Sequence, residues 1–122
     1  MKIKTQALAF VLAFTVLGAA QAQECTRPAK PAVPDGASAE RQEMVEAQQS
    51  VQKYVKSMES YLACIEKQEK AAMKKAKAEE KKLSAERKAA FTKRYNAGVQ
   101  AVKMIAQEFN KQLKAYQKSQ SD

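Results

Sequence analysis

Histidine is absent from this chain of 122 residues, and glycine, proline, cysteine and aspartate are scarce. Without histidine, and with two cysteines that we expect to pair, the common ligands of a transition-metal site are missing. The two aspartates, Asp35 and Asp122, lie in an expected turn and at the end of the chain. Glutamates on a helix would need a pocket before they could serve as acid and base. We therefore expect no enzymatic activity, no metal site and no cofactor.

The residues that break helices are few and grouped. Pro28, Pro31 and Pro34 lie close together, and beyond residue 22 glycine occurs only at Gly36 and Gly98. Alanine, lysine, glutamate and glutamine dominate the rest of the chain, and these residues favour helix. No stretch alternates apolar and polar residues as a half-buried strand would. The composition therefore predicts an all-α protein.

The first 22 residues have the pattern of a secretory signal peptide. Lys2 and Lys4 precede an apolar run over residues 7–17, and Ala20-Gln21-Ala22 closes the segment with small residues around its middle position. The run is shorter than the ~20 residues that span a bilayer. We expect cleavage after Ala22, delivery of the mature protein to the periplasm, and no transmembrane segment in the mature form.

Residues 23–37 are expected to form an extended arm and a turn. Polyproline II has three residues per turn, so prolines at every third position would share one face, and Pro34-Asp35-Gly36 is a strong turn signal. Two cysteines in an exported chain indicate one disulfide, Cys25 to Cys64. From Ser38, the arm would reach ~40 Å back to Cys25 as polyproline II, and the helix would reach ~39 Å on to Cys64. Because these lengths match, the arm can run antiparallel along the helix. Because no C-x-x-C spacing is present, we expect a structural disulfide.

Residues 38–122 carry two periodic apolar stripes, which are typical of helices that pack on a partner. The first comprises Met44, Val51, Met58 and Ile65 at every seventh residue, with Ala47, Tyr54 and Tyr61 three residues on and Val55 and Leu62 four residues on. The second comprises Phe91, Tyr95, Val99, Val102, Ile105, Ala106, Phe109, Leu113 and Tyr116. We expect helices over about residues 38–82 and 84–118, with Ser38 and Ser84 as N-caps.

Two architectures fit these stripes. Folding back at Leu83 and Ser84 would pair Ile65 with Val102, Met58 with Phe109, and Val51 with Tyr116. One continuous helix, ~120 Å long, would instead bury its stripe against another chain. We favour the antiparallel two-helix hairpin, with the Pro-rich extended arm stapled to it by the disulfide.

Residues in the arm and along both apolar stripes resemble a pattern found in a group of proteins. The matching residues are Cys25, Pro28, Pro31, Pro34-Asp35-Gly36, Glu43-Met44, Ala47, Val51, Tyr54, Tyr61-Leu62, Cys64, Asn96-Ala97, Val99, Ala106, Phe109-Asn110 and Gln112. The pattern is similar to that of short exported proteins of proteobacteria with a Cys…Pro-Asp-Gly…Tyr-Leu-x-Cys arrangement. The resemblance implies the fold and the location, and it assigns no activity.

Basic residues are concentrated in the middle of the chain. Removing Lys2 and Lys4 from the formal net charge of +9 leaves +7, and residues 66–94 hold eleven basic and five acidic residues. Like charges at i and i+4, such as Lys70 and Lys74, cost a helix a few tenths of a kcal/mol. One interpretation is a solvated helix face, and the other is attraction to an anionic partner. The candidate binding residues are Lys70, Lys74, Lys75, Lys77, Lys81, Lys82, Arg87, Lys88, Lys93 and Arg94.

These features lead to two functional hypotheses. The first is a non-enzymatic periplasmic protein that binds an anionic envelope component or an unfolded protein client through this basic tip. The alternative is a structural, self-associating coiled-coil protein of the envelope with no small ligand. The tyrosines lie on the apolar stripes, where we expect core packing rather than base stacking, so no nucleic-acid partner is expected. The oligomeric state is left open by the sequence.

Overall fold

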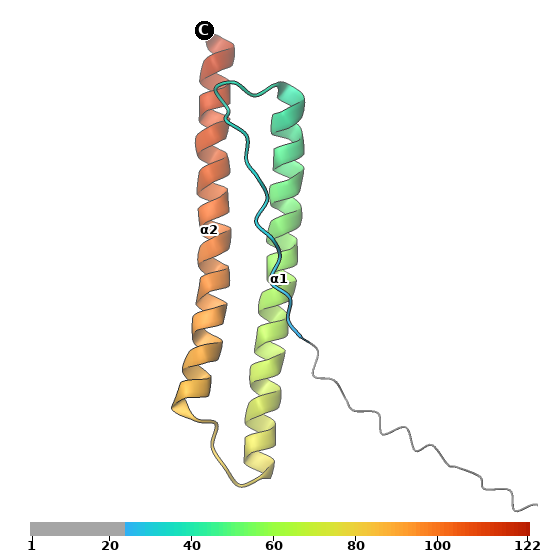
Figure 1. Ribbon diagram of the computed structural model, residues 1–122, viewed down its shortest axis with the longest axis vertical. Coiled ribbons are helices and arrows are strands. Elements are labelled where there is room, and N and C mark those ends of the chain that lie inside the picture. The colour runs from blue at the N-terminus through green and yellow to red at the C-terminus, as the bar shows by residue number, and fades with distance from the viewer. Residues whose placement is uncertain (1–23) are drawn as a thin grey trace, which may run out of the picture.

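The computed structural model describes residues 24–122, which form two long helices that run antiparallel (Figure 1). Helix α1 spans Arg41–Ala78 and helix α2 spans Ala85–Ser121. The described residues contain no strand, so the predicted all-α hairpin is confirmed. No helix within residues 24–122 is long and apolar enough to cross a membrane. The expected signal peptide and its cleavage after Ala22 lie outside the described residues.

The N-terminal arm is a third packed element rather than a loose tail. Residues 24–35 are extended and pass over the helices from the turn at one end toward the middle of α1 (Figure 1). Pro28, Pro31 and Pro34 are half-buried and residues 29, 30 and 32 are exposed, which agrees with a three-residue period. Val33 departs from this period, because it is half-buried as well. The predicted disulfide is present, and the Cα atoms of Cys25 and Cys64 are 5.6 Å apart.

The arm contacts both helices, whereas the sequence placed it along the first helix alone. Val33 packs against the hydrophobic core. Lys30 Nζ lies 2.7 Å from Glu108 Oε2 of α2, although both side chains are substantially exposed. A two-helix hairpin leaves one side of its apolar seam open, and the arm covers part of that side.

The turn between the arm and α1 is built on Asp35. Its carbonyl oxygen accepts hydrogen bonds from the amides of Ser38 (3.1 Å) and Ala39 (2.9 Å), and its side chain accepts one from the Ala37 amide (3.1 Å). Ser38 was expected to cap the helix, and this prediction is wrong, because its hydroxyl donates to Asp35 instead. The N-cap is Glu40, whose amide donates to Glu43 Oε2 at 2.7 Å.

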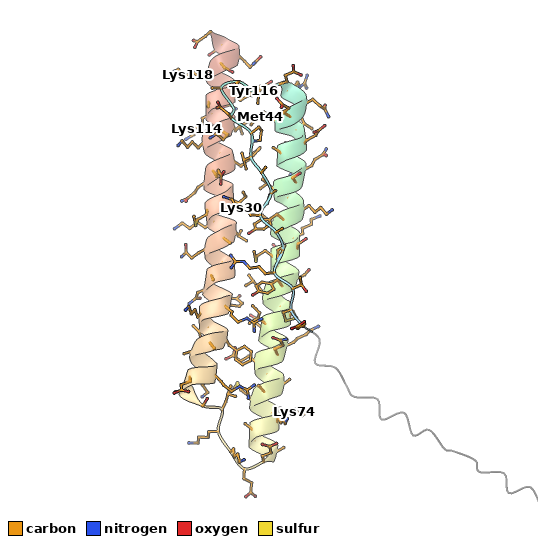
Figure 2. The ribbon with its side chains drawn as sticks, in the orientation of Figure 1. Lys30, Met44, Lys74, Lys114, Tyr116 and Lys118 are labelled. Carbon is orange, nitrogen blue, oxygen red and sulfur yellow. A yellow bond between two sulfur atoms is a disulfide. The ribbon has the colours of Figure 1, made fainter. Side chains whose placement is uncertain are left out.

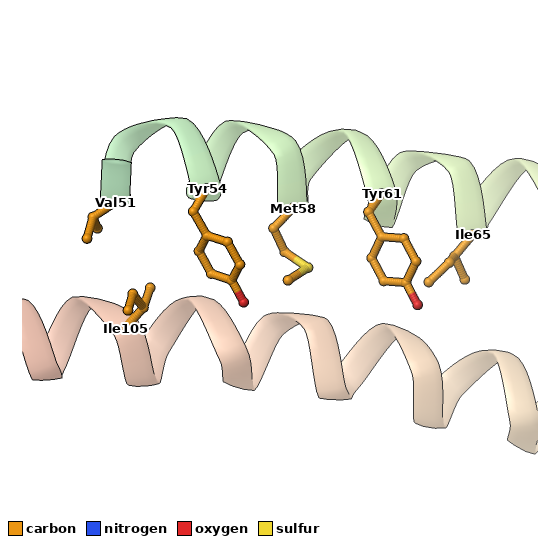
Figure 3. Packing of buried hydrophobic residues seen from close by; sticks show 6 residues of the cluster. All are labelled: Val51, Tyr54, Met58, Tyr61, Ile65 and Ile105. Carbon is orange, nitrogen blue, oxygen red and sulfur yellow. The ribbon is translucent and has the colours of Figure 1, made fainter. Parts of the chain in front are cut away.

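The core follows the predicted stripe of α1. The buried residues of this helix are Met44, Ala47, Val51, Tyr54, Met58, Tyr61 and Ile65, spaced alternately by three and four as in a coiled coil. From α2, Ile105 is fully buried against the middle of this stripe, and the rings of Tyr54 and Tyr61 point toward α2 (Figure 3). Helix α1 is therefore the central element, packed by α2 and by the arm.

Gly98 lies where the two helices approach each other closely. A Cβ atom on Gly98 would lie 2.8 Å from Leu62 Cδ2 and 3.2 Å from Met58 Sδ, so side chains of α1 fill the space over this glycine. The predicted pairing of Met58 with Phe109 is therefore wrong, since Phe109 lies about 16 Å further along α2. Stripes of equal period fit together in several registers. In the observed register, Met58 and Leu62 lie over Gly98.

Helix α1 ends at Ala78, four residues earlier than expected, in a Schellman motif. The Lys81 amide donates to the Ala76 carbonyl (2.8 Å) and the Glu80 amide to the Lys77 carbonyl (3.0 Å). Glu80 takes a left-handed conformation with φ of 55°, a position that glycine usually holds, so sequence alone gave no stop signal there. Ser84 is the N-cap of α2, as predicted, and its hydroxyl accepts from the Arg87 amide at 3.2 Å.

Candidate functional site: the lysine-rich tip

The tip consists of the end of α1 from residue 66, the connector 79–84 and the start of α2 to residue 94. Only Leu83 is buried among these residues, because the apolar stripe of α1 ends at Ile65. The connector therefore turns the chain with little core beneath it. Lys74 lies close to this end of the hairpin, and Lys114 and Lys118 lie near the opposite end (Figure 2). The tip is thinly packed and predominantly basic.

One side of the tip forms a hollow of about 410 Å³, which we call the Met73 hollow. Its apolar members are Met73 and Leu83. Five lysines complete the lining, namely Lys74, Lys77, Lys81, Lys82 and Lys88. They come from the end of α1, from the connector and from the first turns of α2, so the chain reversal brings together groups that one continuous helix would keep apart. Among residues 24–122, none with a carboxylate lines this hollow.

The other side of Leu83 forms a second hollow, of about 340 Å³, which we call the Glu79 hollow. Lys81 and Lys82 line it as well, together with Lys75 and Arg87, but Glu79 contributes a carboxylate and Ser84 a hydroxyl. The negative charge of Glu79 offsets part of the attraction that this side exerts on an anion. The two sides of the tip thus differ in electrostatic character.

Three of the predicted binding residues line neither hollow. Lys70, Lys93 and Arg94 are further from the connector along the helices. The Arg94 guanidinium donates to Gln68 Oε1 of α1 at 3.5 Å, which links the two helices at the base of the tip. These three residues therefore add to the general positive charge of this end without lining either recess.

The helix dipoles add little net charge to the tip. The carboxyl end of α1 and the amino end of α2 meet there, and their partial charges have opposite signs. Lys75 and Lys77 lie in the last turn of α1 and Glu86 in the first turn of α2, so each helix end is complemented by side chains of the favourable sign. The attraction of the tip for an anion therefore comes from its side chains.

Sequence reasoning missed Met73 and Leu83 as parts of the site. Both stood out as the only large apolar residues between Ile65 and Phe91. Their separation by ten residues hid the fact that the connector folds Leu83 back beside Met73. Met73 is 47% exposed, whereas Leu83 is 8% exposed. The available sequence signal for this part of the site was therefore a pair of isolated large apolar residues, one in the first helix and one at the expected turn.

A larger hollow, of about 530 Å³, lies beside the disulfide. It has one lysine, Lys67, and one glutamate, Glu24, so charge of neither sign predominates. Across residues 24–122, no group of three histidine, cysteine, aspartate or glutamate side chains is placed to hold a metal ion. Two recesses beside the arm also combine apolar lining with positive charge only, one through Arg27 and Lys30 and the other through Lys53. The Met73 hollow has the largest number of cations among the recesses described, with five lysines.

Comparison of the chain with protein-family models, curated proteins and solved structures finds no match. Its function must therefore be argued from its own residues.

Proposed function

We propose that this chain is a non-enzymatic periplasmic protein that binds an anionic component of the cell envelope through its lysine-rich tip. The observation that carries the proposal is the lining of the Met73 hollow, where five lysines meet and no carboxylate is present. Like charges gathered from three segments repel one another, and an anionic partner relieves that repulsion. The disulfide supports the compartment, because such bonds persist in oxidising environments.

An unfolded client with acidic segments is the other partner that the charge pattern suggested. The Met73 hollow favours the envelope component. A lysine ammonium group only donates hydrogen bonds, and a phosphate or carboxylate only accepts them. A peptide also presents backbone N–H donors, for which the lysines offer no acceptor. Phe91 lies within the tip and Tyr95 next to it, and both pack against the core. Within residues 24–122, no exposed aromatic side chain at the tip is therefore placed to stack on nucleic-acid bases.

Co-sedimentation with lipid vesicles tests the proposal. The oxidised chain of residues 23–122 should sediment with vesicles of phosphatidylglycerol and remain in solution with vesicles of phosphatidylcholine. Raising NaCl from 0.1 M to 1 M shortens the Debye length from about 10 Å to about 3 Å and should release the protein. Absence of binding to the anionic vesicles at low salt contradicts the proposal.

Two variants of equal charge separate the tip from the rest of the molecule. The triple variant Lys77→Gln, Lys81→Gln, Lys82→Gln removes three charges from the Met73 hollow. The control Lys111→Gln, Lys114→Gln, Lys118→Gln removes three exposed charges near the opposite end. At about 1 kcal/mol per lysine, the tip variant should bind on the order of 100-fold more weakly, and the control should bind nearly as well as the wild type. Equal losses in both variants would mean that net charge alone, and not the tip, attracts the membrane.

A further inference from the structure

We propose that the Met73 hollow binds a single-chain anionic amphiphile, with the anionic head on the lysines and the first part of the acyl chain against Met73 and Leu83. The ligand class is thus a phosphate or carboxylate that carries one acyl chain. The inference rests on the proposed function, because it names the ligand of the same tip. It adds that apolar contact, and not charge alone, holds the ligand.

The floor of the hollow is apolar. Leu83 is almost fully covered and Met73 is about half exposed, so Met73 supplies most of the apolar surface that a ligand in the hollow can contact. Methionine adapts its shape to apolar ligands more easily than branched residues do. The lysines contribute their methylene stems to the same lining, since such side chains bury their stems while the ammonium groups stay in water.

The rim of the hollow is cationic on several sides. Lys74 and Lys77 lie on α1, Lys81 and Lys82 lie in the connector, and Lys88 lies on α2. An anionic head group bound among them receives charge from three separate segments of the chain. A neutral apolar molecule would leave these charges unpaired, and a small inorganic anion would leave the apolar floor exposed to water. Only a ligand that has both an anionic group and an apolar segment pairs with the lysines and also covers the apolar residues of the hollow.

The size of the hollow suits one small molecule. Its volume of about 410 Å³ falls within the range of roughly 300–1,000 Å³ that is usual for small-molecule sites. The hollow is open to solvent, so it can hold an anionic head and the first carbons of one chain while the rest of the chain extends beyond it. We therefore assign the hollow to one chain presented as a free monomer, such as a lysophospholipid or a fatty acid.

Isothermal titration calorimetry with three related probes tests the assignment. The first is myristoyl-lysophosphatidylglycerol below its critical micelle concentration, which has both head charge and chain. The second is myristoyl-lysophosphatidylcholine, which keeps the chain and loses the net charge. The third is glycerophosphoglycerol, which keeps the charged head and loses the chain. The first probe should bind at least about tenfold more tightly than either of the others, because only it uses both rim and floor.

A matched pair of methionine variants tests the floor. Met73→Gln replaces an exposed apolar side chain of the hollow with a polar one of similar length, and the fold should tolerate it. Met104→Gln is the control, since Met104 is 61% exposed on α2 and lines a different recess, with Arg27 and Pro28 of the arm. Met73→Gln should weaken binding of the anionic lysolipid about fivefold to tenfold, and Met104→Gln should leave it unchanged.

The outcomes separate this inference from the function on which it rests. If Met73→Gln binds the anionic lysolipid like the wild type, or if the chainless probe binds equally well, the amphiphile assignment is wrong. Charge-dependent binding to phosphatidylglycerol vesicles would then still support the proposed function. If neither lysolipid nor anionic vesicles bind, both proposals are wrong. Tighter binding of an acidic peptide with apolar side chains than of the lysolipid would overturn the lipid assignment in favour of a protein client.

Discussion

The backbone amide of Gly36 donates a hydrogen bond of 3.0 Å to the side-chain oxygen of Gln112, 76 residues further along the chain. Gly36 is buried, and a Cβ atom at this position would overlap the carbonyl group of Gln112 and lie 2.9 Å from the Tyr116 amide nitrogen. The turn that follows the arm is thus pressed directly against the backbone of α2. This contact joins the first and last parts of the described fold at the end opposite the tip.

Gly36→Ala should destabilise the protein by about 2–3 kcal/mol, because the added methyl group meets backbone that cannot rotate away. Gly98→Ala is the control. Its methyl group meets the flexible ends of Leu62 and Met58, and alanine gains about 1 kcal/mol of helix propensity over glycine. Gly98→Ala should therefore change stability by less than about 1 kcal/mol. Urea unfolding followed by circular dichroism measures both, and a larger loss in Gly98→Ala would contradict this account.

Removing the disulfide should cost most of the stability of so small a domain. The bond between Cys25 and Cys64 closes a loop with a sequence separation of 39 residues, which corresponds to about 4 kcal/mol of lost unfolded-state freedom. The double variant Cys25→Ser, Cys64→Ser should lower the urea midpoint accordingly, and reduction of the wild type should have the same effect. A loss below about 1 kcal/mol would show that the arm stays in place without its staple.

Glu80→Gly should stabilise the protein by about 0.5–1 kcal/mol. Glu80 has a φ of 55°, which glycine adopts without the steric cost that a side chain incurs. Glu79→Gly is the control, because Glu79 has a φ of −88° and gains nothing from glycine there. Thermal unfolding of the two variants decides the point. Equal melting temperatures would remove the argument that the connector is conformationally strained at Glu80.

Much of the fold follows from sequence patterns that depend on local physics. The three-and-four spacing from Met44 to Ile65 predicts the buried face of α1, because helical periodicity alone places these side chains on one side. The three-residue spacing of the prolines predicts the extended arm, and the two cysteines predict the disulfide that attaches it to α1. The helix register could not be predicted in the same way, because stripes of equal period fit together in several registers. The sequence did not show that Met58 and Leu62 would lie over Gly98.

The candidate site could be predicted only in outline. The lysines between Lys74 and Lys88 were evident from charge alone, but their meeting around one hollow depends on where α1 stops. That stop is made by Glu80 in a conformation typical of glycine, and a glutamate in the sequence carries no such signal. Without the position of the connector, Leu83 could not be placed beside Met73.

The tip should open more readily than the rest of the hairpin. Among residues 66–94 only Leu83 is buried, whereas the segment from Met44 to Ile65 contains seven buried residues. Local opening is governed by the apolar contacts that must be broken. Hydrogen exchange of the oxidised protein should therefore be faster in the amides of residues 76–90 than in those of residues 51–65. Uniform protection along both helices would contradict this prediction.

Site-resolved nuclear magnetic resonance tests the central claim most directly, because it shows where an anionic amphiphile binds. The oxidised chain of residues 23–122, labelled with nitrogen-15, would be titrated with myristoyl-lysophosphatidylglycerol below its critical micelle concentration. We predict saturable shifts in the amides of residues 73–88, with the largest changes around Met73 and Leu83. Shifts confined to the Pro-rich arm or to the C-terminal half of α2, or no shifts at all, would contradict the account.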